Sequence, residues 1–349
     1  MKKYHATSFT KLLFLVGAVL LLGGCATADK AKTRVLWPAP PNQPRLEWVG
    51  TYWSLDQMPK TKTEKMTKSI LGGQPQQVFR RPVAVASSGD GRIFVTDADK
   101  RQITVYDMNS RSVYPFKHTG AVRLPFGLAV DSAGRLFVAD AGGRSVLVFG
   151  ADGAPLFSIG GPELLEYPVF LALDETRDRI YVSDSRAHRI VVFDLKGNYI
   201  RSFGEWGPQD GNFYGPQGMA VDKNGNLYVA DMFNARVQVF DAEGNFVRKF
   251  GERGDKQWNF EMPKDIAIDS DGNLHITDAR KKAMVTYDAE GRLLLFTGGG
   301  DPSHPLSFAL PGGIWVDKND RIYVVDQISR RFAIWQYLNA DYLKEHPLP

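Results

Sequence analysis

Six aspartates recur along the chain at intervals of 43, 44, 47, 47 and 48 residues, and a series of carboxylates could bind a cation or act as acids. They are Asp97, Asp140, Asp184, Asp231, Asp278 and Asp326. A base follows each of them after four or five residues: Arg101, Arg144, Arg189, Arg236, Lys282 and Arg331. Asp satisfies turn amides locally, and a feature present once in each unit describes the scaffold. We therefore interpret these aspartates as structural.

Histidines are the next candidates, because a catalytic zinc commonly has three protein ligands. The chain after residue 24 contains His118, His188, His275, His304 and His346. His275 takes a strand position that is aromatic in other units, which indicates a packed core residue. No G-x-S-x-G motif occurs, and the single cysteine, Cys25, lies near the N-terminus. The sequence thus assigns no catalytic residue, no metal ligand and no cofactor.

The elements that would position a site form six repeated units. They begin at Pro82, Pro125, Pro168, Pro216, Pro263 and Pro311. In the fourth unit, Met219–Val221 and Leu227–Val229 are apolar runs separated by a turn in which Asn224-Gly225 is expected to supply positive φ angles. Val237–Phe240 and Phe246–Phe250 add two more strands. Short strands repeated about every 40–50 residues are typical of propeller blades, so we predict an all-β, six-bladed β-propeller.

The ends of the repeated region predict how the ring closes. The last unit lacks a fourth strand, whereas Arg45–Tyr52 is a β-prone run that stands alone before the first unit. Placing that run in the last blade removes two exposed sheet edges. We expect a propeller over residues 44–338 and a C-terminal tail over 339–349. Residues 54–80 match no repeat, and one interpretation of Thr61–Ile70 is a short helix.

The units resemble NHL repeats over nearly all of residues 81–338. The resemblance lies in VADMFNARVQVFD at 229–241, VADAGGRSVLVF at 138–149 and VSDSRAHRIVVFD at 182–194. It implies a bacterial NHL-type propeller. Enzymes with this kind of propeller include amidated-peptide lyases, which use a histidine-bound zinc, and calcium-dependent lactonases, which use acidic and amide groups at the axis. A metal-dependent lyase or hydrolase with its site at the central channel therefore stays open as the alternative function.

The residue after each unit's proline offers little to a multivalent metal, because the set is mostly apolar or neutral. It consists of Val83, Phe126, Val169, Gln217, Lys264 and Gly312. The loops at 205–214 and 252–260 are longer than their counterparts and rich in aromatic residues, which favours either recognition or packing between blades. We predict a ligand-binding rim around the axis, on the face of the propeller that carries these two loops. Its residues are Phe126, Gln217, Phe233, Asn234, Lys264, Arg280 and Gln327.

The N-terminus is typical of an exported lipoprotein. Lys2, Lys3 and Lys11 flank the apolar run Leu12–Leu22, which is too short to span a bilayer. Leu22–Cys25 resembles the lipobox, which implies a signal peptide over 1–24, a lipidated Cys25 and a flexible tether over 25–43. Ala26 favours the outer membrane if the organism is Gram-negative.

Removal of three lysines with the signal peptide lowers the net charge from +4 to +1. Nucleic-acid binding requires several phosphates to be neutralised, so no nucleic-acid partner is expected. We therefore expect a monomeric, membrane-anchored scaffold of the cell envelope that binds an envelope protein or a glycan.

Overall fold

The computed structural model describes residues 34–58, 76–299 and 306–348. By its internal contacts the chain divides into Met1–Val35 and Leu36–Pro349. The first unit lies almost wholly outside the described residues, as do the apolar run Leu12–Leu22 and Cys25, and the fold below is that of the second. Within the described part, no helix is long and apolar enough to cross a membrane.

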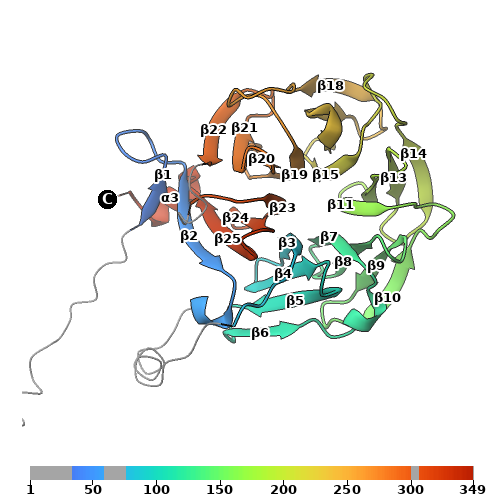
Figure 1. The fold of residues 1–349 in the computed structure, drawn as a ribbon, viewed down its shortest axis with the longest axis horizontal. Coiled ribbons are helices and arrows are strands. Elements are labelled where there is room, and N and C mark those ends of the chain that lie inside the picture. The colour runs from blue at the N-terminus through green and yellow to red at the C-terminus, as the bar shows by residue number, and fades with distance from the viewer. Residues whose placement is uncertain (1–33, 59–75, 300–305, 349) are drawn as a thin grey trace, which may run out of the picture. The chain divides into compact units, whose positions relative to one another are not determined.

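Six antiparallel sheets stand in a ring around a central axis (Figure 1). Blade one comprises β3 (Pro82–Ser87), β4 (Arg92–Asp97), β5 (Gln102–Asp107) and β6 (Ser112–Pro115). Blade two comprises β7 (Pro125–Val130), β8 (Leu136–Asp140), β9 (Ser145–Phe149) and β10 (Pro155–Ile159). Blade three comprises β11 (Pro168–Asp174), β12 (Arg179–Asp184), β13 (Arg189–Phe193) and β14 (Tyr199–Phe203). Blades four and five comprise β15 (Pro216–Val221), β16 (Leu227–Asp231), β17 (Arg236–Phe240) and β18 (Phe246–Phe250); and β19 (Pro263–Ile268), β20 (Leu274–Asp278), β21 (Ala283–Tyr287) and β22 (Leu293–Gly298). The predicted six-bladed all-β propeller is confirmed.

The sixth blade joins the two ends of the repeated region. It contains β23 (Pro311–Val316), β24 (Arg321–Asp326), β25 (Arg331–Tyr337), β2 (Leu46–Tyr52) and β1 (Val35–Trp37). β2 pairs antiparallel with β25 from Leu46 opposite Tyr337 to Tyr52 opposite Phe332. The predicted closure of the ring by the N-terminal strand is therefore confirmed.

β1 corrects one expectation about the tether. Its residues fall within the segment predicted to be flexible, yet they form the outer strand of the closing blade. The indole N–H of Trp37 donates to the carbonyl oxygen of Phe296 in blade five at 3.0 Å. Trp37 also packs against the cluster around Trp335. The prolines that follow β1 dominated the composition of the segment and concealed this short apolar strand.

Two short helices flank the ring. η1 (Leu55–Gln57) begins at Ser54, whose side chain accepts the N–H of Asp56. α3 (Ala340–Glu345) lies in the predicted C-terminal tail and begins at Asn339, whose side chain accepts the N–H of Tyr342 at 2.7 Å. Thr61–Ile70, for which a helix was one interpretation, lies wholly outside the described residues.

Most of the apolar core lies between neighbouring blades. One cluster joins Phe137 and Val148 of blade two to Ile180 and Phe193 of blade three, and similar clusters follow around the ring. In blades two to six an aspartate builds the turn within the first hairpin, as in Asp222, whose carboxylate accepts the N–H groups of Asn224 and Asn226. Gly225 alone takes a positive φ in that turn, so the expectation that Asn224 shares it is wrong.

The axis has a repeat of two blades, which sequence inspection did not reveal. At the third position of each first strand, a glycine in blades two, four and six faces a larger residue in the next blade: Gly127 faces Phe170, Gly218 faces Asp265 and Gly313 faces Ala84. A Cβ at Gly127 would lie 2.7 Å from Cα of Phe170. Because the glycines allow this close approach, the larger side chains from alternate blades reach the axis.

Candidate functional site

The six repeated aspartates are structural, as the sequence predicts, and each holds the loop that enters its own blade. All six are buried at the end of the second strand of their blade. Asp140 accepts the N–H groups of Arg123 and Leu124, which precede the first strand of the same blade, at 3.0 and 2.6 Å. Backbone N–H groups at the equivalent place bond to each of the other five. A carboxylate that accepts such bonds fixes the loop entering its blade.

Only some of the bases that follow these aspartates in the sequence pair with them. Arg189, Arg236 and Arg331 pair with the aspartates of their own units at 3.4, 2.8 and 3.6 Å. Arg144 instead donates to the carbonyl oxygens of Leu165 and Pro162.

We call the face on which the first strands begin the start face, and the opposite one the end face. The two long loops at 205–214 and 252–260 lie on the start face, and each has one aromatic side chain packed between blades and another that is exposed. Phe213 and Phe260 are fully buried between blades, whereas Trp206 and Trp258 are 65% and 53% exposed. Each loop brings its two ends together, through bridges between Trp206 and Phe213 and between Arg253 and Phe260. One aromatic residue of each loop therefore anchors it, and another faces solvent.

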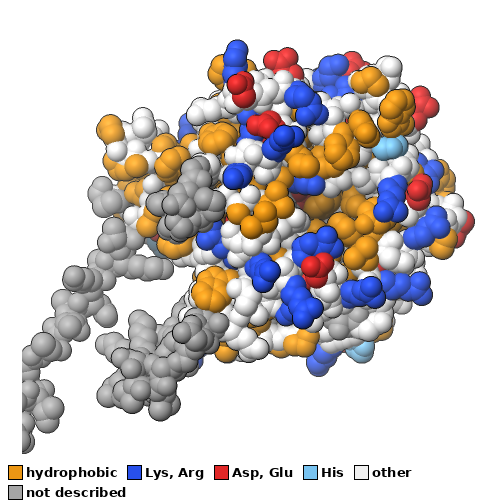
Figure 2. Space-filling view, in the orientation of Figure 1, with side chains coloured by type: hydrophobic (Ala, Val, Ile, Leu, Met, Phe, Trp, Pro, Cys, Tyr) orange, Lys and Arg blue, Asp and Glu red, His pale blue; other side chains and the backbone are white. Residues whose placement is uncertain are grey.

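Three exposed rings form an aromatic cluster on the start face. The ring centroid of Tyr214 lies 6.2 Å from that of Trp206, 4.9 Å from that of Phe233 and 5.8 Å from that of His188. Phe233 belongs to η3 (Met232–Asn234) and is 47% exposed. Figure 2 shows hydrophobic side chains near the middle of this face with Lys and Arg side chains gathered around them.

The structure brings three of the predicted rim residues together at η3. The Phe233 ring lies tilted beside that of Tyr214, and Asn234 donates to the carbonyl of Gly207 in the aromatic loop at 3.0 Å. Lys264 Nζ lies 3.2 Å from Met232 Sδ. Burial lowers the pKa of Lys264, against the opposing effect of Asp278.

The other four predicted rim residues have partners elsewhere around the ring. The ring of Phe126 lies 5.7 Å from that of Tyr167, and Gln217 donates to Ser185 at 2.9 Å. Arg280 pairs with Glu261 at 3.4 Å, and the Gln327 side chain lies beside Gly312. These four residues are therefore distributed over several blades and do not form one compact pocket.

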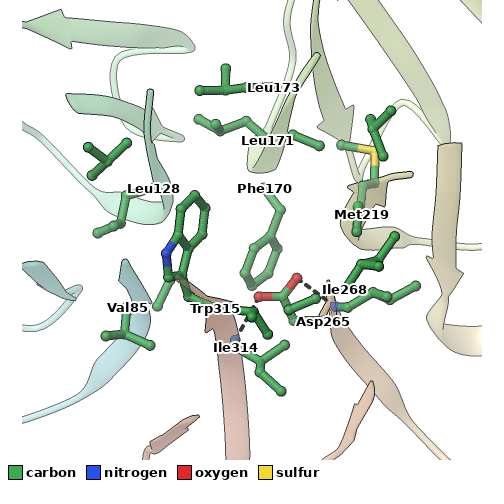
Figure 3. Close-up of a pocket in the computed structure, with 18 of the residues that line it drawn as sticks. Val85, Leu128, Phe170, Leu171, Leu173, Met219, Asp265, Ile268, Ile314 and Trp315 are labelled. Atoms are coloured by element: carbon green, nitrogen blue, oxygen red, sulfur yellow. Dashed lines mark hydrogen bonds between the residues drawn. The ribbon is translucent and has the colours of Figure 1, made fainter. Parts of the chain in front are cut away.

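A central cavity of about 290 Å³ lies on the axis. Figure 3 views this cavity from the face opposite to that seen in Figure 1, because the blades run clockwise in Figure 3 and counterclockwise in Figure 1. The side chains that line the cavity are apolar except for those of Asp265 and Glu175, and they include Phe170, Met219 and Trp315. Partly exposed residues at the ends of the first strands, such as Leu173 and Val316, also line it. The cavity therefore opens toward the end face.

Asp265 is the ionisable group inside this cavity that sequence reasoning missed. Its side chain is buried, and its two oxygens accept the N–H groups of Ile314 at 2.8 Å and Ile266 at 2.9 Å. Burial raises the pKa of Asp265 to about 8, although those N–H groups favour the charged form. The sequence does contain one signal for Asp265. It is the third residue of its first strand, and none of the equivalent residues in the other blades is ionisable: they are Ala84, Gly127, Phe170, Gly218 and Gly313.

The described residues do not provide the donors that a catalytic metal needs. No three histidine, cysteine or acidic residues lie together in the part of the chain that the structure describes. His275 is buried between Asp269 and Thr286, as expected for a core residue, and His304 lies outside the described residues. Calcium requires six to eight oxygen ligands, whereas the side chains of the lining offer two carboxyls, Asp265 and Glu175, and both already accept hydrogen bonds from within the protein. The cavity does not fit a calcium ion.

Two family models match parts of the chain. Residues 163–251 match the SMP-30/gluconolactonase/LRE-like region, and residues 222–297 match a 6-bladed β-propeller family. No curated protein matches in sequence.

Solved structures are similar in fold. A protein of unknown function from Bacteroides thetaiotaomicron has 17% identity and a TM-score of 0.62, covering 84% of this chain and 75% of that one. A gluconolactonase from Xanthomonas campestris has 16% identity and a TM-score of 0.58, covering 90% and 100%. Virginiamycin B lyase from Staphylococcus aureus, in a catalytically inactive form with quinupristin, has 14% identity and a TM-score of 0.56, covering 77% and 86%. At these identities the similarity establishes the fold alone.

Proposed function

We propose that this protein is an exported, lipid-anchored binding module whose partner, a protein of the cell envelope, docks on the start face of the propeller. The observation that carries the proposal is the aromatic cluster of Trp206, Tyr214 and Phe233. Large exposed rings that touch one another are costly to leave in water, and they are enriched where one protein binds another.

The surroundings of the cluster support a protein partner with acidic groups. The exposed Arg253 donates to the carbonyl of Phe233 at 2.7 Å, which places its guanidinium beside the rings. Lys264 lies against η3 from the neighbouring blade. Aromatic anchors with adjacent cations combine buried apolar area with charge complementarity, which sets the orientation of a partner.

The proposed anchor rests on the lipobox-like sequence that ends at Cys25. Since β1 begins at Val35, nine residues would separate Cys25 from the closing blade, and the ten Cα–Cα steps between Cys25 and Val35 span at most about 35 Å when extended. Such a short connection would keep the propeller close to the membrane. A Cys25→Ser variant should lose the acyl mass and move from the membrane fraction to the soluble fraction.

The alternative function, a metal-dependent lyase or hydrolase, has less support. Its expected site is the central channel, where the lining holds two carboxylates, Asp265 and Glu175, and is otherwise apolar. Glu175 already accepts the N–H and the hydroxyl of Ser132 at 2.9 and 2.5 Å.

The test is cross-linking in intact envelopes followed by capture of the full chain. A Trp206→Ala, Phe233→Ala double variant should lose at least about 90% of the captured partner, because truncated anchors typically cost more than 1 kcal/mol each. Tyr199→Ala is the matched control, because Tyr199 is about as exposed as Phe233 but lies on the outer strand β14, away from the cluster. Equal capture by all three proteins would refute docking on the start face. Binding of a glycan in place of a protein would refute the partner class.

A further inference from the structure

Two features of the central cavity are not required by the fold: a buried carboxyl and the aromatic side chains near it. The carboxyl of Asp265 stands where the equivalent blades place Ala84 or Phe170, so the ring closes without a charge at this position. Gly218 opposite has no Cβ, and a Cβ there would lie 1.8 Å from Oδ1 of Asp265. Gly218 belongs to the two-blade repeat of the axis, and the room that it leaves is filled here by a carboxyl that burial disfavours.

Two aromatic side chains line the cavity together with that carboxyl. Figure 3 shows the Phe170 ring beside Asp265 and the Trp315 indole on the side toward Val85 and Leu128. The indole nitrogen of Trp315 is buried and has no hydrogen-bond partner in the structure. Aromatic faces attract cations, and the attraction is strongest where water is excluded.

We infer that the central cavity binds a small organic cation with an apolar body, whose charge pairs with Asp265 while Phe170 and Trp315 contact its alkyl groups. The site is separate from the aromatic cluster on the start face and does not depend on the proposed function. Pairing with a cation in this cavity would convert the buried acid to its charged form. The N–H groups of Ile314 and Ile266 already point at its oxygens and would stabilise that charge.

The other charged groups on the surrounding strands are engaged elsewhere. Lys264 on β19 lies against Met232. On β20, His275 bonds to Asp269, and Asp278 accepts the N–H groups of Glu261 and Met262. β3, β7, β15 and β23 contain no ionisable residue, and Asp174 at the end of β11 pairs with Arg177 at 3.1 Å. No cationic side chain lines the cavity, so a cation that pairs with Asp265 there has to come from outside.

The size and opening of the cavity fit a small ligand. About 290 Å³ is at the lower end of the range for small-molecule sites, so the ligand holds few heavy atoms. Glu175 lies in the lining as a second carboxylate. A negative group there would raise the local concentration of cations and lower that of anions.

The probe that tests this inference is phenyltrimethylammonium, whose charge does not change with pH. Its neutral isostere tert-butylbenzene and the anion benzoate serve as comparisons, with calorimetric titration of the full chain in a non-ionic detergent from pH 6 to 9.5. Since the cation requires the charged carboxyl, its affinity should rise about tenfold per pH unit up to about pH 8 and then level off. The neutral isostere should bind more weakly, and benzoate should not bind.

Variants separate the carboxyl from the cavity. Asp265→Asn, which keeps the acceptor for Ile314, should weaken binding of the cation at pH 9 at least tenfold and abolish its pH dependence. Phe170→Leu should weaken binding without changing the pH profile. Glu175→Gln removes the second carboxylate of the lining and should lower the affinity by up to about threefold while keeping the pH profile. Glu243→Gln, an exposed carboxyl that does not line the cavity, is the matched control and should change neither. The inference is overturned if Asp265→Asn retains the pH profile, if tert-butylbenzene binds as tightly as the cation at pH 9, or if no saturable binding occurs.

Discussion

Gly218 and Asp265 come from neighbouring blades and share one volume at the axis: the carboxyl oxygen of one occupies the space that a Cβ on the other would need. The Cβ would lie 1.8 Å from Oδ1 and 2.5 Å from Cα of Asp265. Gly218 does not have a positive φ, so the requirement for glycine here is steric. The Gly127–Phe170 and Gly313–Ala84 pairs repeat this arrangement around the axis.

Gly218→Ala is therefore expected to destabilise the protein by about 3 kcal/mol or more, because backbone atoms of β19 have to move. The measurement is the free energy of unfolding in urea. Gly120→Ala is the control, since nothing lies within 4 Å of a Cβ there. Equal stability of the two variants would show that the blades are farther apart than described.

The Asp265 carboxyl also predicts how stability depends on pH. Its pKa is about 8 in the folded protein and 3.8 in the reference state, so between these values the folded state holds a proton that the unfolded state releases. The contribution of this group to stability is complete below about pH 4 and is lost as the pH rises toward 8, by up to about 1.4 kcal/mol per unit. Asp265→Asn should remove this slope and raise the melting temperature at pH 8. Parallel pH profiles for both proteins would mean that Asp265 is charged when folded.

The fold was predictable because its signals are local and repeated six times. In the fourth unit, Leu227–Val229 and Val237–Phe240 are apolar runs separated from their neighbours by turns that contain Gly and Asp. The last unit lacks a fourth strand, and the run at Arg45–Tyr52 lies outside the repeats, so it was expected to supply that strand. β1 was not predictable by the same reasoning. Three residues before a proline-rich segment carry no periodicity, and Trp37 is held by Phe296, which is 259 residues away.

The candidate sites divide in the same way. Exposed aromatics such as Trp206 were recognisable, because their loops are longer than those of other units. Asp265 was not recognisable in this way, because the second residue after each proline reaches the axis only through the glycine of the preceding blade. That close approach is a property of packing between blades, so a single unit cannot reveal it.

The repeated aspartates differ in what they hold, which predicts unequal costs of replacement. Asp231 pairs with the buried Arg236 at 2.8 Å, whereas Asp140 bonds to backbone N–H groups and Arg144 turns away. Asp231→Ala removes the nearer of the two carboxylates beside the buried Arg236, leaving Asp210 at 3.5 Å, and should cost about 3 kcal/mol or more, against about 1–3 kcal/mol for Asp140→Ala. Unfolding in urea measures both. A larger cost for Asp140→Ala would show that the backbone bonds, and not the arginine, dominate.

The closing blade allows its two N-terminal strands to be tested separately. β2 buries Leu46 and Tyr52, and the Tyr52 ring stacks on Phe332 at 5.2 Å, whereas β1 covers β2 from outside. Deleting residues 44–53 exposes the edge of β25 and opens the ring, so the whole propeller should melt at a much lower temperature. Trp37→Phe removes one indole N–H donor and should cost about 1 kcal/mol. Thermal melting of both variants beside the full chain makes the comparison. If the deletion variant melts like the full chain, the ring does not depend on β2 for its closure.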